Sequence, residues 1–194
     1  MNIVLVGKTG SGKSSICDWL TENLRYDKLR SYTTRPKREG ETDEYHFITE
    51  QQYDALDLVL KTEINGYRYG VMRHDLADAD CKILIVDPSG VEELVRIPDF
   101  DFVCIYVDCP ACERMHRCQL RGDNYFDIIE RMNEEVHMFD GFVPTVIVDN
   151  DRDKFDSAAL DVLKAVKEAE DCLRQSCTKQ EKSQQSRLSN TAMT

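Results

Sequence analysis

The sequence predicts an α/β fold with a parallel β-sheet flanked by helices. Four apolar runs lack the alternation of half-exposed strands and are typical of strands covered on both faces: residues 2–6, 83–86, 102–107 and 145–148. Stretches with apolar residues at helical spacing separate several of these runs. Strands that alternate with helices favour parallel pairing, because each connection has to cross one face of the sheet.

The length and composition fit a single domain. A chain of 194 residues with 41% hydrophobic residues is long enough to bury one substantial core. Its 36 acidic and 25 basic residues give a net charge of −11, which disfavours binding to nucleic acid or to an anionic membrane. The longest apolar runs are far too short to span a bilayer. We therefore expect a soluble protein with no nucleic-acid partner and no membrane partner.

Two sequence features bear on the compartment and on the thiols. The first residues lack the basic start, apolar middle and small-residue cleavage site of an export signal, so we expect a cytoplasmic protein with reduced cysteines. Cys109 and Cys112, near His116 and Cys118, have the spacing of zinc ligands. This segment follows a predicted strand and opens a helix with Pro110 in its first turn, which favours ordinary thiols over a metal site.

The first predicted elements are a strand at residues 2–6, a glycine-rich turn and a helix over residues 14–24. Ile16, Leu20 and Leu24 recur at helical spacing and give this helix one apolar face. The glycine-rich turn therefore joins the end of a buried strand to the start of a helix.

Residues 31–80 depart from this pattern and predict a small mixed α/β insert. Short stretches of alternating polarity surround a turn at Gly66 and a helix-like piece at residues 51–60. The predicted core, residues 1–30 and 81–172, contains two further helices with one apolar face each, at 124–140 and about 153–172.

The end of the chain has a different composition. Residues 173–194 are rich in Ser, Gln, Thr, Lys and Asn and contain almost no large apolar side chain. Burial cannot offset the entropy lost on ordering such a segment. We expect one folded domain over residues 1–172 and a disordered tail over 173–194.

The turn after the first strand carries a phosphate-binding motif. Residues 7–14 read GKTGSGKS and satisfy the pattern GxxxxGK[ST] between a predicted strand and a predicted helix. In this pattern backbone N–H groups surround a phosphate, Lys13 bridges the β- and γ-phosphates, and the Ser14 hydroxyl ligates Mg²⁺. The motif predicts a P-loop NTPase-type sheet that binds ATP or GTP with Mg²⁺. The expected nucleotide-binding residues here are Gly7, Gly10, Ser11, Gly12, Lys13, Ser14 and Ser15.

A second cluster of positive charge suggests another bound anion. Arg30, Arg35, Lys37 and Arg38 lie close together in an otherwise acidic chain. Residues 31–47, SYTTRPKREGETDEYHF, resemble the monophosphate-binding signature of the guanylate kinase family, S-x-[TS]-T-R-x-x-R-x-x-E followed by Y-x-F. The segment before the Y-x-F element is about two residues shorter here than in that pattern. The order of the phosphate-binding groups is the same.

The resemblance to guanylate kinases extends over roughly residues 2–170. Glu63 and the segment YRYG at 67–70 resemble the family's base-binding Glu and its Y-Y-G element, and DPSGV at 87–91 resembles D-x-x-G-V. Arg117, Arg121 with Gly122, and Arg131 resemble the arginines of the family's lid, and residues 147–151 its segment near the ATP adenine. The resemblance implies a guanylate-kinase-like domain with a nucleotide-monophosphate-binding insert and a helical lid at about 113–131.

The resemblance also implies how GMP or dGMP is bound. By position, Arg35, Arg38, Tyr45 and Tyr69 hold the monophosphate, whereas Ser31 and Glu63 face the base. Guanidinium groups and phenolic hydroxyls suit a phosphate, and a carboxylate accepts both N1–H and N2–H of guanine.

Two positions depart from the family pattern. Val71 stands where a Ser or Thr follows Y-Y-G, and Ile85 stands where the family has an acidic residue. Both positions contact the base in the family, so a nucleoside monophosphate is better supported than guanine itself.

The mechanism implied by the resemblance is in-line phosphoryl transfer from ATP. The acceptor oxygen is already ionised, so positioning and charge neutralisation carry the catalysis. The expected catalytic residues are Lys13, Arg117, Arg121 and Arg131. Mg²⁺ is expected on Ser14 and, through water, on Asp87, and Asn150 is expected near ATP.

Two alternatives to a guanylate kinase stay open on the sequence. Val71 and Ile85 favour a broader (deoxy)nucleoside monophosphate kinase. A guanylate-kinase-like module that binds phosphorylated peptides belongs to another functional class. The intact Gly12, Lys13 and Ser14 argue against that module, because it needs no working ATP loop.

Overall fold

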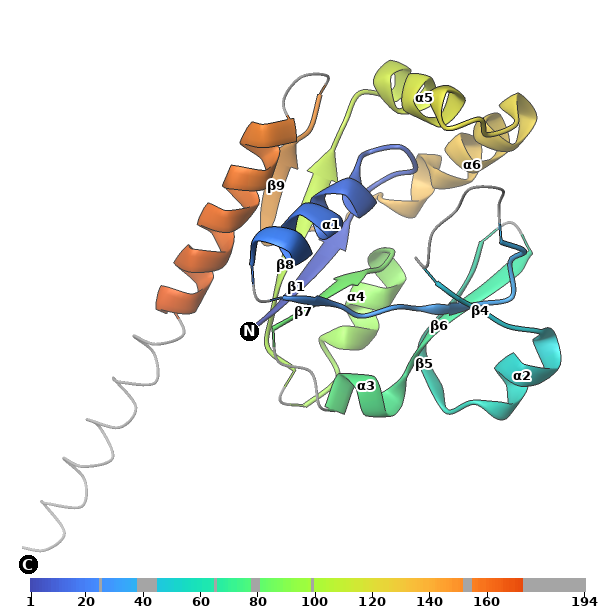
Figure 1. Cartoon of the computed structure of the whole chain (residues 1–194), viewed down its shortest axis with the longest axis horizontal. Coiled ribbons are helices and arrows are strands. Elements are labelled where there is room, and N and C mark those ends of the chain that lie inside the picture. The colour runs from blue at the N-terminus through green and yellow to red at the C-terminus, as the bar shows by residue number, and fades with distance from the viewer. Residues whose placement is uncertain are drawn as a thin grey trace, which may run out of the picture.

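The computed structural model describes residues 1–24, 26–37, 45–64, 66–77, 81–98, 100–151 and 155–172. The predicted tail at 173–194 and the predicted phosphate ligand Arg38 lie outside the described residues. Within the described part, no helix combines the length and the hydropathy needed to cross a membrane. Figure 1 shows a core sheet flanked by helices, with a second, smaller sheet beside it.

The core sheet has the predicted parallel arrangement. Its strand order is β2-β7-β1-β8-β9, and every neighbouring pair is parallel. The central strand β1 is buried at all five positions, as expected for a strand covered on both faces. The strands are β1 (Asn2–Val6), β2 (Asp27–Lys28), β7 (Lys82–Ile85), β8 (Phe102–Asp108) and β9 (Val146–Asp149).

Helices cover both faces of this sheet and give it two apolar layers. On one face, α1 (Lys13–Asn23) and a helix at residues 155–172 pack against Ile3, Leu5 and Ile105. On the other face, α4 (Pro88–Leu94) and parts of the insert pack against Val4 and Val6. The alternate residues of β1 therefore enter different layers, which fixes the sheet between them.

Two helices follow β8 and reach over the end of the sheet that carries the glycine-rich turn. They are α5 (Ala111–Leu120) and α6 (Tyr125–Met138), joined by a turn at Arg121 and Gly122. Asn124 caps α6, because its side-chain oxygen accepts the Phe126 N–H at 2.9 Å. The predicted helix at 124–140 therefore begins and ends close to its expected limits.

The second sheet lies in the region of the predicted insert and has the order β4-β3-β6-β5. It combines one parallel pair, β3 with β4, and two antiparallel pairs. Two short helices accompany it. The elements are β3 (Tyr32–Thr33), β4 (His46–Phe47), α2 (Glu50–Ala55), β5 (Leu58–Ile64), β6 (Tyr67–Met72) and α3 (Arg73–Ala77).

A bulge in β5 changes which side chains face each side of the second sheet. Val59 pairs with Val71, and the next pair is Thr62 with Tyr69, so β5 advances three residues while β6 advances two. Leu60 sits in this bulge with a φ of 51°, in the left-handed region. The extra residue reverses the alternation of the strand from Thr62 onward.

We predict that the isoleucines of neighbouring core strands differ strongly in their contribution to stability. Ile105→Ala in β8 removes a side chain that is 0% exposed and should lower the free energy of unfolding by about 2–5 kcal/mol. Ile147→Ala in β9 changes a residue that is 64% exposed and should cost about 0.5 kcal/mol or less. Denaturant unfolding measures both, and equal losses would contradict the burial described above.

Candidate active site

One cavity of roughly 470 Å³ joins the glycine-rich turn of the core to the second sheet. The turn and the arginines of α5 and α6 line one end, and strands β5 and β6 line the other. The expected site residues that reach this cavity are Gly7, Gly10, Gly12, Lys13, Ser14, Ser15, Ser31, Arg35, Tyr45, Tyr69, Asp87, Arg117, Arg121 and Arg131.

The glycine-rich turn has the shape of a phosphate cradle. Gly10 and Gly12 have φ values of 78° and 96°, which other residues rarely adopt. A Cβ at Gly10 would also lie 2.5 Å from the Arg114 carbonyl oxygen, and one at Gly12 2.2 Å from Asn150 Nδ2. Because α1 begins at Lys13, its first N–H groups open into the cavity, where they favour an anion. The residues present therefore fit a nucleotide phosphate.

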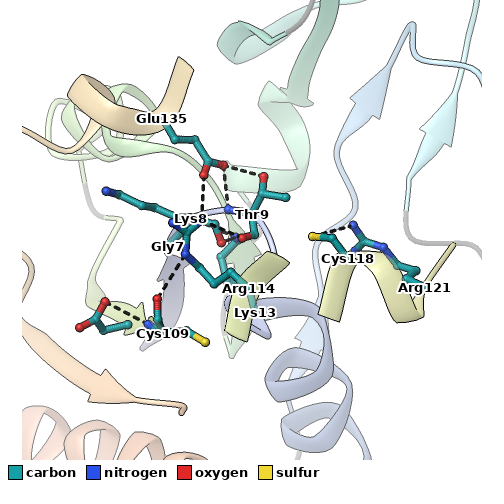
Figure 2. A network of polar contacts seen from close by, with 10 residues as sticks. Gly7, Lys8, Thr9, Lys13, Cys109, Arg114, Cys118, Arg121 and Glu135 are labelled. Atoms are coloured by element: carbon teal, nitrogen blue, oxygen red, sulfur yellow. Dashed lines mark hydrogen bonds and ion pairs between the residues drawn. The ribbon is translucent and has the colours of Figure 1, made fainter. Parts of the chain in front are cut away.

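Lys13 is folded back onto the turn. Its Nζ donates to the carbonyl oxygens of Gly7 at 2.6 Å and Lys8 at 3.1 Å (Figure 2). Burial lowers the pKa of Lys13 to about 8; the nearby carboxylate of Glu135 partly opposes this shift, and the cations of Arg114 and Arg121 add to it. An incoming phosphate would supply the negative charge that favours the protonated amine.

The oxygen donors expected for Mg²⁺ lie on two elements. Ser14 lines the cavity from the first turn of α1, and Asp87 lines it from the residue that caps α4. One oxygen of Asp87 already accepts from the Gly90 N–H at 2.8 Å and from the Ser89 hydroxyl at 2.7 Å. Hydroxyl and carboxylate oxygens, supplemented by water, suit Mg²⁺. The donor set therefore fits this cation.

An ion pair holds the glycine-rich turn from the side of α5 and α6 (Figure 2). Glu135 accepts from the Thr9 N–H at 2.7 Å and from the Thr9 hydroxyl at 2.6 Å. Arg114 donates to the Thr9 carbonyl oxygen at 3.0 Å and to the Cys109 carbonyl oxygen at 3.2 Å, and it pairs with Glu135 at 3.4 Å. The peptide groups on both sides of Thr9 are thus fixed by two buried charges.

Neither Arg114 nor Glu135 is predicted as a site residue by a local sequence pattern. Both lie at helical spacing from expected catalytic arginines, since Arg114 precedes Arg117 by three residues and Glu135 follows Arg131 by four. Residues three or four apart share one face of a helix. The spacing alone predicts that these residues share a helix face with the expected arginines. It does not predict which charged residues on that face contact the glycine-rich turn.

Arg117, Ser11 and Asn150 form a second support behind the turn. Arg117 donates to the Ser11 carbonyl oxygen at 3.4 Å and to the Asn150 carbonyl oxygen at 2.9 Å. Asn150 Nδ2 also donates to the Ser11 carbonyl oxygen, at 2.8 Å. Ser11 and Asn150 are each only 1% exposed and do not line the cavity. The Asn150 side chain thus supports the turn through the Ser11 carbonyl oxygen.

The other two expected catalytic arginines share one carboxylate. Arg121 and Arg131 both line the cavity, and both pair with Asp123, with Arg121 Nε at 3.2 Å and Arg131 Nη1 at 3.3 Å. The Asp123 side chain is only 4% exposed. The sequence analysis did not identify Asp123, which holds these two cations beside the cavity.

A third group of residues forms a cationic and phenolic surface on the second sheet. Arg35 is 9% exposed, and its guanidinium lies 5.5 Å from the ring centre of Tyr45 and 5.4 Å from that of Phe47. The rings of Tyr45 and Tyr69 lie edge to face at 5.9 Å. Ser31 also lines the cavity on this side. This surface faces the same cavity as the glycine-rich turn.

The structure places Glu63, the residue expected to face the base, outside the cavity lining. Thr62, Ile64, Tyr67 and Tyr69 line the cavity, whereas Glu63 is exposed and does not. Glu63 pairs across the sheet with Arg68, whose guanidinium lies over the ring of Tyr53. The bulge at Leu60 is the physical reason, because it reverses the alternation of β5.

Comparison with known proteins identifies the family. A family model described as an AAA domain matches residues 3–138. A curated guanylate kinase of Bartonella quintana (strain Toulouse) is 28% identical over 140 residues, which cover 65% of this chain and 62% of that protein. One of Syntrophotalea carbinolica (strain DSM 2380 / NBRC 103641 / GraBd1) is 32% identical over 135 residues, which cover 62% of each chain. The chain belongs to the guanylate kinase family of P-loop proteins.

A solved structure shows that the fold is shared with this family. The crystal structure of guanylate kinase from Anaplasma phagocytophilum superposes with a TM-score of 0.61, covering 88% of this chain and 85% of that chain at 23% sequence identity. The aligned part of this chain spans 62% of the length of each of the two curated guanylate kinases above. The glycine-rich turn is thus the P-loop of a guanylate kinase family member.

We predict that Glu135 stabilises the fold of this family member through the P-loop. Glu135→Gln removes the charge beside Arg114 and should lower the free energy of unfolding by about 1–3 kcal/mol, since the Arg114 cation stays buried. Glu130→Gln is the matched control, because Glu130 is exposed on the same helix. Denaturant unfolding of both variants tests this, and equal stability of the two would contradict the role of Glu135.

We also predict that nucleotide binding takes up a proton at Lys13. The pKa of free Lys13 is about 8, and bound phosphates raise it, so binding above that pH converts the neutral amine to the charged form. Calorimetric titration with a non-hydrolysable ATP analogue at about pH 8.5, in buffers of different ionisation enthalpy, measures this uptake. Lys13→Arg should remove it, because arginine stays charged; uptake that persists in this variant would assign the proton elsewhere.

Proposed function

We propose that this chain transfers the γ-phosphoryl group of ATP to the phosphate of a nucleoside monophosphate. The observation that carries the proposal is one cavity with two anion-binding surfaces. The P-loop with Lys13 forms the first, and Arg35, Tyr45 and Tyr69 form the second. Arg121 and Arg131 line the same cavity. Two polyanions that meet between such cations are the substrates of a phosphotransferase.

The proposed mechanism needs no general base, because the acceptor phosphate is already ionised. The P-loop N–H groups and Lys13 hold the phosphates of ATP, and Arg35 with the two tyrosines orients the acceptor. Mg²⁺, held by Ser14 and through water by Asp87, supplies charge neutralisation of the ATP phosphates when it is bound. Arg117 lines the cavity and also fixes the carbonyl group of Ser11, and with it the P-loop.

The arginines of the proposed lid change partners during the reaction. Arg121 and Arg131 pair with Asp123, so they contribute to the transferred group only when phosphate replaces part of that pairing. Gly122 follows Arg121 with a φ of 84°, which gives the turn between α5 and α6 the freedom to move. Closure of residues 113–131 excludes water and so suppresses hydrolysis of ATP.

The relatives indicate which acceptors are tested first. The curated proteins above are named guanylate kinase, which favours GMP or dGMP with ATP and Mg²⁺. A kinase of free nucleotides fits a cytoplasmic protein that needs neither a nucleic-acid nor a membrane partner. The phosphoryl-transfer chemistry does not depend on the base, so the reaction class and the base are tested separately.

We predict that Lys13→Ala abolishes phosphoryl transfer. The variant removes a cation at the transferred group and should lower kcat by about 10²–10³-fold or more. Lys82→Ala is the matched control, since Lys82 lies far from the cavity in a surface pair with Asp27 and should keep wild-type turnover. A coupled assay of ADP release with GMP, dGMP, AMP, CMP and dTMP measures both. No acceptor-dependent ADP release from the wild-type protein would refute the proposed function.

A further inference from the structure

The part of the cavity lined by β5, β6 and β7 includes an apolar wall. Leu60, Val71 and Ile85 line it together with Ile64, and Leu60 and Val71 are only 4% and 2% exposed on the whole molecule. These side chains come from three strands, β5, β6 and β7, so the apolar wall is built by both sheets. The base of an acceptor whose phosphate lies on Arg35 would reach this wall, because Arg35 and the wall residues line the same cavity.

The position of Leu60 in this wall is fixed by the backbone. Leu60 occupies the bulge of β5 with a φ of 51°, and its N–H donates to a Glu93 carboxylate oxygen at 2.9 Å. Glu93 belongs to α4 of the core and does not line the cavity. The apolar side chain of Leu60 is therefore held in the wall. The Glu93 carboxylate that holds it accepts a hydrogen bond from the Leu60 backbone N–H.

The carboxylates of the cavity are not available to the base. Among the described residues that line it, Asp87 and Glu135 are the only acidic ones. Asp87 caps α4, and Glu135 is bonded to Thr9 and Arg114 at the P-loop. Glu63 lies on the opposite face of the second sheet, on the side of Arg68. Among the described residues that line this part of the cavity, Ser31, Thr62 and Tyr67 carry hydroxyl groups.

We infer that the acceptor base is recognised by apolar contact and that the preferred acceptor is a thymine nucleotide, dTMP, rather than GMP. This inference rests on the proposed function. Guanine would bring the N1–H and N2–H donors to a wall whose described residues offer no carboxylate to accept them, which disfavours its binding. Thymine has a single ring N–H donor, which one hydroxyl can accept, and a methyl group that packs on branched aliphatic side chains.

The remaining bases fit this wall less well than thymine does. Uracil lacks the methyl group, and one methyl group in an apolar pocket changes selectivity by about 10- to 200-fold. Cytosine and adenine each bring an exocyclic amine to this wall, and neither carries the methyl group that packs on its branched side chains. The apolar wall is thus the specificity-determining feature, and Leu60, Val71 and Ile85 are its main residues.

The test compares acceptors and variants of the full chain at saturating ATP. We expect kcat/KM for dTMP to exceed that for dUMP by about 10-fold or more and to exceed that for GMP and dGMP. Glu63→Gln should leave the ratio of dTMP to GMP unchanged, because Glu63 faces away from the cavity. Val71→Thr conserves the shape of the side chain and adds a hydroxyl to the wall, so it should shift that ratio toward GMP.

Two outcomes separate this inference from the proposed function. GMP as the best acceptor, together with a selective loss of GMP use in Glu63→Gln, would overturn the inference and leave the kinase intact. If the wild-type protein transfers no phosphoryl group, the proposed function fails, and calorimetric binding of dTMP, dUMP and GMP still decides the inference. Tighter binding of dTMP than of both others supports it, and any other order overturns it. Thermal unfolding checks that both variants are folded.

Discussion

The site depends on how the P-loop backbone is held from behind. A glycine-rich loop has many conformations, and its buried peptide groups each need a partner. Thr9 is fixed by Glu135 and Arg114, and the Ser11 carbonyl group by Arg117 and Asn150. These partners come from α5, α6 and the residue after β9, which only the folded sheet brings together. The phosphate cradle is therefore a product of the tertiary structure as much as of its own sequence.

The same supports connect the P-loop to the proposed lid. Arg114 and Arg117 lie on α5 and bind the loop, whereas Arg121, at the end of that helix, pairs with Asp123. The first part of α5 is thus tied to the loop, and its end leads into the turn at Gly122. Motion of the lid would pivot near this turn while the P-loop stays fixed, so preorganisation of the ATP site and mobility of the arginines are compatible.

Local patterns predicted the parts of the structure that local physics determines. Buried apolar runs predicted the parallel sheet, and the glycines before Lys13 and Ser14 predicted the phosphate loop. Both predictions were possible because a short segment of sequence determines strand burial and the backbone conformation of the loop. The partners of the loop were missed, because Glu135 lies 126 residues from Thr9. Glu63 lies outside the cavity lining, contrary to the expected position, for another reason. Strict alternation along β5 would place it with Val59 and Val71, but the bulge at Leu60 inserts one residue and reverses its side.

Under the proposed base site, this bulge offers a way for one scaffold to keep its chemistry and change its substrate. The groups that handle phosphate belong to the loops after the core strands and to Arg35, Tyr45 and Tyr69. The groups that meet the base belong to β5, β6 and β7. Because the two sets share few residues, a change of register in one strand replaces the surface that contacts the base and leaves the charges around the transferred group in place. If the base lies on this wall as proposed, acceptor choice is set by strand register and wall polarity, independently of the P-loop.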